Sequence, residues 1–220
     1  MSNIRCIQKE IRAVALRAQR AYEEIQLIVV SKNRTVEEIQ EVYKEGCRDF
    51  GESRIPEALQ KMECTPSDIR WHFIGKLQKN KVGKAIGKFA LIHSVDCYEL
   101  AEYISTLSEK RGVKTAILLQ TNTSGELSKG GLSPEKWEEL FPKVLELTGI
   151  EVAGLMTMAP YTEDERVIRN TFCLLKRLQE KLQKVYGVPL ATLSMGMSHD
   201  YPLAIEEGAT LIRLGEAIFS

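Results

Sequence analysis

The chain has 220 residues, of which 44% are hydrophobic, and its 30 Lys and Arg residues are balanced by 30 Asp and Glu residues. This length and composition predict one folded domain over 1–220 and exclude a chain that is disordered throughout. The zero formal net charge excludes an overall basic field for nucleic acid. Its apolar runs are too short to span a bilayer, and the charged N-terminus does not resemble a signal peptide. We therefore expect a cytoplasmic protein that binds neither nucleic acid nor membranes.

The cysteines argue against a disulfide framework and against a zinc site. Their number is odd, and no two of them have the spacing of paired metal ligands. Such a set is typical of a reducing compartment. The residues concerned are Cys6, Cys47, Cys64, Cys97 and Cys173.

The first third of the chain begins with a helical pattern and then a strand pattern. Apolar residues recur at steps of three and four over 4–25, which predicts an amphipathic helix. The β-branched run at 25–32 predicts a strand that is buried on both faces. Thr35 and Glu38 then form a capping-box pair, which predicts that a second helix begins there.

The same strand–helix unit recurs to the end of the chain. Seven further apolar runs predict strands, at 47–53, 69–75, 88–96, 113–122, 149–156, 189–196 and 209–215. Helical patterns separate them, and Pro134 begins one helix at a position where proline is tolerated. The alternation predicts an α/β fold, a single (β/α)8 barrel of the TIM type with an extra N-terminal helix. The alternative is an open doubly wound sheet, which the absence of a GxGxxG turn after the first strand disfavours.

Lys32 is the first candidate for chemistry. Ligands bind in such barrels at the carboxyl ends of the strands, and Lys32 follows the first apolar run directly. We expect it in or at the mouth of the barrel, where burial would favour a neutral amine that forms imines with carbonyl groups. The alternative is a lysine whose charged end reaches solvent just past the strand.

Two loops near the C-terminus have the composition of a phosphate site. The segments at 194–200 and 213–216 are rich in glycine and serine, and each leads into a helix. Free backbone N–H groups at helix starts bind phosphate, and barrels commonly place such a site after strands seven and eight. Ser198 adds a hydroxyl, while Gly196 and Gly215 permit a close backbone approach. Ordinary turn glycines and helix caps are the alternative.

Arg213 lies inside the last apolar strand and requires a partner, because a guanidinium keeps its proton. That partner is either a buried carboxylate, such as Asp96 or Glu52, or an acceptor atom of a ligand. One ligand satisfies all three features. Pyridoxal phosphate has an aldehyde for Lys32, a phosphate for the two loops and a ring nitrogen for Arg213.

With these residues in place, the chain resembles the YggS/PROSC family of pyridoxal-phosphate homeostasis proteins, which are similar to the N-terminal barrel domain of alanine racemase. The resemblance covers nearly the whole chain. It rests on VVSK at 29–32, FGES at 50–53, IRWHFIGKLQKNK at 69–81, IHSVD at 92–96, NTSGELSKGGLSP at 122–134, GLMTM at 154–158, LSMGMSHD at 193–200 and IRLGEAIF at 212–219.

The resemblance implies a role for each candidate residue. Lys32 is expected to hold the cofactor as an imine and Arg213 to contact its ring nitrogen. Ser198 is expected to hold the phosphate with backbone N–H groups around Met197 and Gly215. The remaining expected cofactor-binding residues are Ser53, His72 and Glu216; no metal is expected.

Three positions depart from the usual pattern of that family. Ser53 stands where the family mostly has Asn, and Lys76 where His is common. Glu216 stands where Thr or Ser usually adds a hydroxyl near the phosphate. A carboxylate beside a phosphate dianion is repulsive unless it turns away, although the Glu216 N–H can still bind. We therefore expect weaker cofactor binding than is usual for the family.

The resemblance implies a role in cofactor homeostasis without established turnover. Arginine at the ring nitrogen discourages protonation and makes the ring a weaker electron sink. The sequence ends shortly after the last barrel strand, so we expect a monomer without the second domain that completes the racemase site. We expect a carrier or regulator whose partners are pyridoxal phosphate and the enzymes that depend on it.

Two other functions remain as alternatives. The first is a narrow-scope amino-acid racemase, in which His72, His199 or Tyr201 would act as the second base. The second is a regulatory protein that senses the cofactor and contacts its partners through the basic segment at 77–88.

Overall fold

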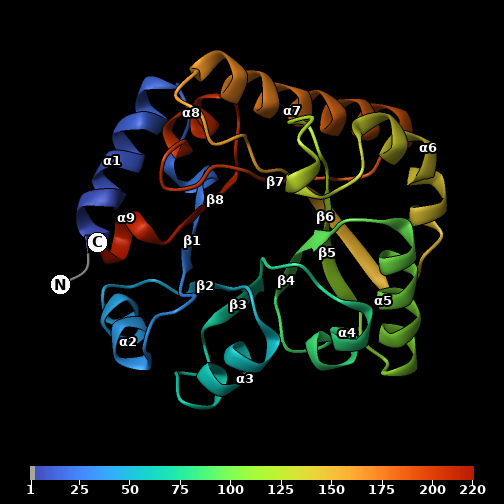
Figure 1. The fold of residues 1–220 in the computed structure, drawn as a ribbon, viewed down its shortest axis with the longest axis horizontal. Coiled ribbons are helices and arrows are strands. Elements are labelled where there is room, and N and C mark those ends of the chain that lie inside the picture. The colour runs from blue at the N-terminus through green and yellow to red at the C-terminus, as the bar shows by residue number, and fades with distance from the viewer. Residues whose placement is uncertain (1–2) are drawn as a thin grey trace.

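The computed structural model describes residues 3–220, and within them eight parallel strands close into a barrel (Figure 1). Each strand pairs with its neighbours in the sequence, and β8 pairs with β1. The predicted TIM-type barrel is confirmed, and the open sheet is wrong. The strands are β1 (Gln26–Val30), β2 (Asp49–Glu52), β3 (Arg70–Phe73), β4 (Leu91–Val95), β5 (Thr115–Gln120), β6 (Ile150–Met156), β7 (Thr192–Ser194) and β8 (Leu211–Leu214).

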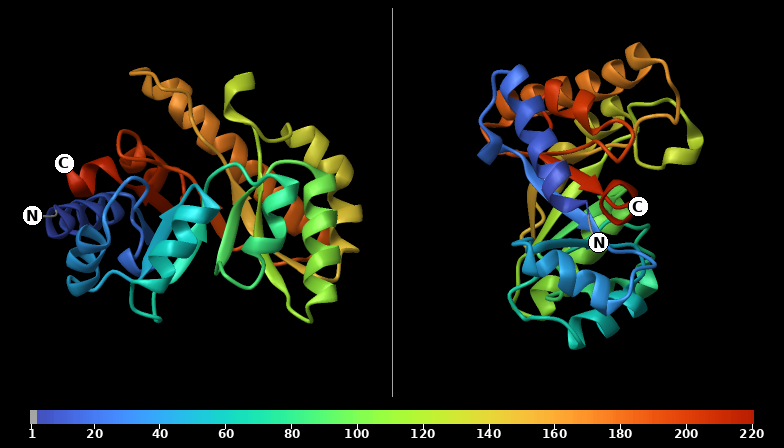
Figure 2. Two further views of the ribbon diagram at one scale, coloured as in Figure 1. Left: turned by 60° about the horizontal axis from the view of Figure 1, so that its bottom comes forward. Right: turned by 90° about the vertical axis from the view of Figure 1, so that its left-hand side faces the viewer.

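Helices surround the barrel, and Figure 2 shows this arrangement from two further sides. The α-helices are α1 (Ile4–Arg17), α2 (Val36–Lys44), α3 (Ile55–Glu63), α4 (Lys79–Ala85), α5 (Tyr98–Lys110), α6 (Pro134–Leu145), α7 (Glu165–Tyr186), α8 (Tyr201–Glu206) and α9 (Glu216–Phe219). Asn3 lies against the C-terminal helix α9, because its N–H donates to the Ile218 carbonyl at 2.9 Å. Within residues 3–220, no helix combines the length and apolar character needed to cross a membrane.

The local signals in the sequence place several helix starts correctly. Thr35 Oγ1 accepts from the Glu38 N–H at 3.3 Å, and the Glu38 carboxylate accepts from the Thr35 N–H at 2.7 Å. This is the predicted capping box, at the start of α2. Pro134 is the first residue of α6, as predicted.

The first helix is shorter than its apolar pattern predicts. It ends at Arg17 rather than continuing to position 25, and Gln19 has a φ of 55° that no α-helix continues through. Arg20 then donates from Nη1 to the carbonyl groups of Ile205 and Ala209, at 2.9 and 2.7 Å. These contacts fix the chain as it turns back towards β1.

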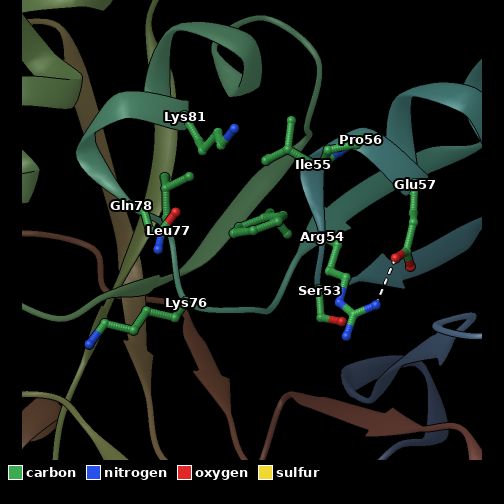
Figure 3. Close-up of a pocket in the computed structure, with 10 residues that line it drawn as sticks. Ser53, Arg54, Ile55, Pro56, Glu57, Lys76, Leu77, Gln78 and Lys81 are labelled. Atoms are coloured by element: carbon green, nitrogen blue, oxygen red, sulfur yellow. Dashed lines mark hydrogen bonds and ion pairs between the residues drawn. The ribbon is translucent and has the colours of Figure 1, made fainter.

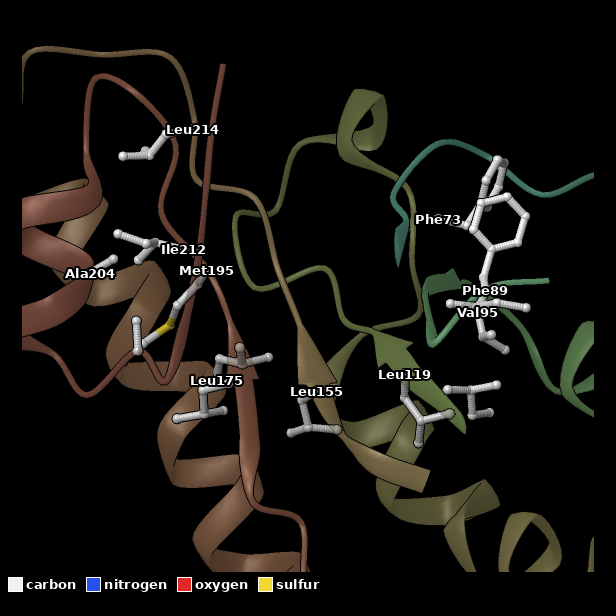
Figure 4. Close-up of a cluster of buried hydrophobic side chains, with 14 of the residues drawn as sticks. Phe73, Phe89, Val95, Leu119, Leu155, Leu175, Met195, Ala204, Ile212 and Leu214 are labelled. Atoms are coloured by element: carbon white, nitrogen blue, oxygen red, sulfur yellow. The ribbon is translucent and has the colours of Figure 1, made fainter. Parts of the chain in front are cut away.

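The apolar core lies mainly between the barrel and its helices. Figure 4 shows strand residues Leu119 and Leu155 together with Leu175 of α7, and all three are fully buried. A second, smaller cluster includes Ile28 and Leu211. Ile28 lies opposite Arg213 in the β1–β8 register, so both side chains are on the inner face of the barrel. The interior therefore mixes apolar and charged side chains.

Candidate functional site

A cavity of about 400 Å³ opens at the carboxyl ends of the strands. Its volume is in the range of pockets that hold small ligands. Val30, Ile74 and Met156 form part of its apolar wall. Of the residues predicted for the cofactor site, those that line this cavity are Lys32, Ser53, Met197, Ser198, Arg213, Gly215 and Glu216.

Lys32 lies at the mouth of the cavity in a tight turn that follows β1. The Arg34 N–H donates to the Ser31 carbonyl at 3.0 Å, and Asn33 has a left-handed φ of 59°. The position at the mouth agrees with the prediction, but the expected burial is wrong, because residue 32 is exposed. The strand ends two residues earlier, at Val30, so Lys32 lies in the turn beyond it.

A buried ion pair between Glu52 and Lys61 fixes the start of this turn. Glu52, which is fully buried at the end of β2, accepts at Oε1 from Lys61 Nζ at 2.6 Å and from Ser31 Oγ at 2.7 Å. Lys61 Nζ also donates to the Ser31 carbonyl at 2.7 Å. Sequence reasoning missed Lys61, whose only signal was its place on α3, nine residues after Glu52. The pair fixes the residue that immediately precedes Lys32.

The loop after β7 is shaped for a close backbone approach. Gly196 has a φ of 94°, and a Cβ there would come within 2.6 Å of the Ala204 side chain, so only glycine fits. The buried Asp200 accepts from the Met197 N–H at 2.5 Å, which fixes the loop. Burial raises the pKa of Asp200, although the bond from Met197 opposes that shift.

The loop after β8 lies against this first loop. Ser198 Oγ accepts from the Ala217 N–H, in the first turn of α9, at 3.3 Å. A Cβ on Gly215 would lie 3.0 Å from the Val30 carbonyl oxygen, which leaves little room for a side chain there. A hydroxyl, a glycine and helix-start N–H groups thus gather in one corner of the cavity, as a phosphate site requires.

Arg213 contributes the deepest charged group of the cavity. It is buried, and it donates from Nη1 to Ser194 Oγ at 2.5 Å and from Nη2 to the Thr157 carbonyl at 3.0 Å. Burial lowers its pKa to about 10, an effect that the nearby Asp200 carboxylate opposes. A carboxylate partner at Asp96 or Glu52 was the alternative from the sequence, and neither residue fills that role.

His72 does not line the cavity, contrary to its predicted place in the cofactor site. Its ring is buried in the barrel, where it contacts Asp49 and His93. His72 is the third of the four residues of β3, and its ring is directed to Asp49, the first residue of β2. The family resemblance placed His72 in the site because its strand lines the pocket, but its ring contacts other buried side chains inside the barrel.

The two other bases considered for a racemase differ in position. Tyr201 is buried and does not line the cavity, and burial together with the neighbouring Glu10 carboxylate raises the pKa of its hydroxyl. His199 does line the cavity, and its ring lies 5.1 Å from that of Tyr161. Sequence reasoning missed Tyr161, which is exposed in the loop after β6. Of the three candidates, only His199 faces the site.

A smaller cavity of about 220 Å³ adjoins the first one at Ser53 (Figure 3). Lys76 and Lys81 line it, and the Arg54 guanidinium there is paired with Glu57 at 2.9 Å. Lys76, one of the departures from the family pattern, therefore faces this side pocket and does not line the main cavity. Within residues 3–220, no three His, Cys, Asp or Glu side chains gather as a metal site would require.

The main cavity fits the groups of pyridoxal phosphate. A phosphate matches the glycine-rich corner, where added Cβ atoms would clash, and an aldehyde matches an exposed primary amine at the mouth. Arg213 uses two of its five N–H donors inside the protein, so others are free to meet an acceptor in the cavity. The fold and site define a (β/α)8 barrel with a small-molecule cavity at its carboxyl end.

Comparisons with known proteins identify the family. The sequence model described as alanine racemase, N-terminal domain, matches residues 4–220. A pyridoxal phosphate homeostasis protein of Aquifex aeolicus (strain VF5) is 42% identical over 214 residues, which cover 97% of this chain and 94% of that protein. The chain therefore belongs to the alanine racemase N-terminal domain family, among relatives that are named pyridoxal phosphate homeostasis proteins.

Solved structures agree with this assignment. PipY of Synechococcus elongatus PCC7942 is 37% identical, and the match covers 95% of this chain and 98% of PipY. The TM-score is 0.87 for PipY without PLP and 0.83 for PipY with PLP bound. An alanine racemase of Clostridium difficile 630 is 17% identical with a TM-score of 0.78, over 99% of this chain and 59% of the racemase, and shares the fold.

Proposed function

We propose that this protein binds pyridoxal 5'-phosphate and acts in the homeostasis of that cofactor, as a carrier or regulator rather than an enzyme. The observation that carries the proposal is that Lys32, Ser198, Arg213 and Gly215 line one cavity. The names of the relatives and the PLP-bound form of PipY support it.

Each residue then has a defined task. Lys32 binds the aldehyde covalently as an imine, and its exposed position permits the cofactor to enter and leave. Ser198 and the N–H groups around Met197, Gly215 and Glu216 hold the phosphate. Ser53 lines the same wall. When bound, the cofactor supplies an electrophilic carbon and an electron-withdrawing ring.

Arg213 sets the character of the site. Because a guanidinium only donates hydrogen bonds, a pyridine nitrogen that accepts from it remains unprotonated. An unprotonated ring stabilises carbanions less well, which favours storage over amino-acid chemistry. The exposed entrance at Lys32 also fits release better than sequestered catalysis.

Absorption spectroscopy of the protein titrated with pyridoxal phosphate tests the proposal. We expect the band of a protonated lysine imine, and borohydride reduction followed by peptide mapping should mark Lys32. Saturation without such a band, or the label on Lys76 or Lys81, would contradict the assignment. We also expect a cytoplasmic, monomeric protein with one domain over 1–220; sedimentation with and without cofactor tests the oligomeric state.

Transfer of the cofactor to dependent enzymes is the expected outcome of this binding. We expect apo-enzymes that require pyridoxal phosphate to be the recipients. Their rate of activation by the loaded protein can be compared with the rate of spontaneous release into a trap for free cofactor. Equal rates indicate release through solvent, and faster activation indicates direct transfer.

A narrow-scope racemase is the second candidate, because His199 lines the cavity and can exchange protons. Exchange of amino-acid α-protons in heavy water separates the two functions. The carrier should show no exchange above that of the free cofactor. Exchange that is saturable and is lost in His199→Gln would support the racemase instead.

A further inference from the structure

Buried polar side chains form a continuous hydrogen-bonded chain through the barrel interior and end at Arg213. His72 Nε2 lies 3.1 Å from Asp49 Oδ1, and His72 Nδ1 lies 3.0 Å from His93 Nε2. His93 Nδ1 lies 2.9 Å from Ser194 Oγ, which accepts from Arg213 Nη1 at 2.5 Å. All five residues are at most 7% exposed.

This hydrogen-bonded chain of side chains crosses the barrel from the amino ends of the strands to their carboxyl ends. Asp49 is the first residue of β2 and lies opposite Arg70, the first residue of β3. Arg70 donates to both oxygens of Asp49, and its side chain is 59% exposed. Arg213 lines the cavity at the opposite end. An ion pair at the amino ends of β2 and β3 is thus connected to the candidate cofactor site.

The charges at the two ends fix the direction of the hydrogen bonds. Burial alone would raise the pKa of Asp49, but hydrogen bonds from His72 and Arg70 outweigh it and lower that pKa, so the carboxylate is ionised and only accepts. Burial lowers the pKa of His93 well below its usual range, and the positive charge of Arg213 acts in the same direction. The His93 ring is therefore neutral.

One proton arrangement suits these ends with both rings neutral. Arg213 donates to Ser194, and Ser194 donates its hydrogen to His93 Nδ1. His93 then donates from Nε2 to His72, which donates from Nε2 to Asp49. The reverse arrangement would set a bare ring nitrogen against the carboxylate. Because its hydrogen is committed to His93, Ser194 offers only lone pairs to Arg213.

We propose that Asp49, His72, His93 and Ser194 are positioning residues that hold the Arg213 guanidinium in the orientation needed to donate to the ring nitrogen of the cofactor. The inference rests on the proposed function. Inward positions of such barrels are dominated by bulky apolar side chains, and a buried polar chain costs stability wherever one link fails. The need to orient a single buried cation, the Arg213 guanidinium, explains why these polar residues are linked in this order.

The first test uses the unliganded wild-type chain and needs no substitution. Nitrogen-15 NMR of the side chains reports which nitrogen of each histidine carries the proton. The sequence has three histidines, and His199, which lies outside the hydrogen-bonded chain of side chains, serves as the reference ring. We expect both His72 and His93 to carry the proton on Nε2 at neutral pH. A proton on Nδ1 of His93, or a doubly protonated His72, would overturn the proposed direction.

The second test measures how strongly the protein prefers pyridoxal phosphate over its 1-deaza analogue, in which a C–H replaces the ring nitrogen. One hydrogen bond to a charged group should give the wild type roughly a tenfold or greater preference. In Ser194→Ala this ratio should fall roughly three- to tenfold, because Arg213 is no longer held. A general loosening of the pocket would weaken both ligands equally and leave the ratio unchanged.

Matched variants complete the test. Ser108 is fully buried and bonds to Thr115 Oγ1 at 2.7 Å, outside the chain, so Ser108→Ala should keep the wild-type ratio. Ser194→Thr retains the hydroxyl and should restore most of it. If wild type binds pyridoxal phosphate but Ser194→Ala keeps the full ratio, this inference fails while the proposed function stands. If wild type binds neither ligand, the proposed function fails with it.

Discussion

Ser198 accepts a hydrogen bond from the backbone N–H of Ala217 at 3.3 Å, which ties the loop after β7 to the first turn of α9. Both proposed halves of the phosphate site are therefore connected before any ligand binds. The bond is long, and a phosphate oxygen is a stronger acceptor than a hydroxyl. Ser198 can thus turn its hydroxyl towards a phosphate while the N–H groups of α9 find a better partner.

Ser198→Ala should weaken the binding of pyridoxal phosphate by about 1–3 kcal/mol, the contribution of one hydrogen bond to a charged group. Fluorescence or absorbance titration gives the dissociation constant, and the imine should still form at saturation. Ser133 caps α6 in the same way, by accepting from the Lys136 N–H at 3.3 Å. Ser133→Ala should lower stability without changing affinity. An unchanged constant in Ser198→Ala would remove this residue from the phosphate site.

Lys32→Ala should abolish the imine and leave weaker binding through the phosphate loops. The reason is that the amine provides the covalent link, whereas the loops after β7 and β8 contact the phosphate separately. Borohydride reduction with mass spectrometry measures the covalent fraction, and a phosphate-dependent titration measures the remainder. Lys76→Ala, in the neighbouring pocket, is the matched control and should keep the label. Full labelling of Lys32→Ala would mean that another lysine holds the cofactor.

Glu216→Thr should tighten binding, because it removes an exposed like charge beside the proposed phosphate position and adds a hydroxyl donor. The gain should be about 1 kcal/mol, from one hydrogen bond and a partly screened repulsion. The repulsive part should shrink at high salt. Titrations of apo wild type and variant at low and high salt measure both parts. Weaker binding by the variant at both salts would show that Glu216 has a useful contact of its own.

The sequence predicts the barrel and most of the cavity wall because both depend on local patterns. Alternating strand and helix signals determine the topology, and parallel strands bring their carboxyl ends together. Lys32 and Ser198 each follow a strand pattern and Arg213 lies near the end of one, so their convergence follows from closure of the barrel. The capping pair at Thr35 was equally local.

The partners of buried side chains could not be predicted in this way. His93 and Ser194 are 101 residues apart in the sequence, and their contact exists only after the barrel closes. The sequence indicated that Arg213 needs a partner, but the nearest acceptors are a serine and a backbone carbonyl and not a carboxylate. The contacts of His72 with Asp49 and His93 were likewise invisible, since the alternation of faces does not say which buried groups a side chain meets.

Lys61→Met should destabilise the fold by about 3–5 kcal/mol, because it leaves the fully buried Glu52 carboxylate without its cation. Chemical denaturation measures the free energy of unfolding. Lys61→Met combined with Glu52→Gln removes both charges and should recover much of the loss. Lys181→Met removes an exposed pair with Glu138 and should cost at most about 1 kcal/mol. Equal losses in the two single variants would show that burial of the Glu52 pair is unimportant.

The free energy of unfolding should decrease as the pH falls below about 6.5, because the folded protein keeps His93 neutral. Burial lowers the pKa of His93 well below its usual range, so the unfolded chain binds a proton at pH values where the folded chain does not. The stability that this neutral ring contributes is complete above the unfolded pKa and is lost on acidification by up to about 1.4 kcal/mol per pH unit.

Chemical denaturation at about pH 7.5, 6.5 and 5.5 measures the slope of the free energy of unfolding against pH. His93→Gln should flatten it while lowering stability at all three values. The lowered pKa of Asp49 acts in the same direction but only below about pH 4, near the carboxyl's unfolded pKa. A slope in His93→Gln as steep as that of the wild type would contradict a buried neutral ring at this position.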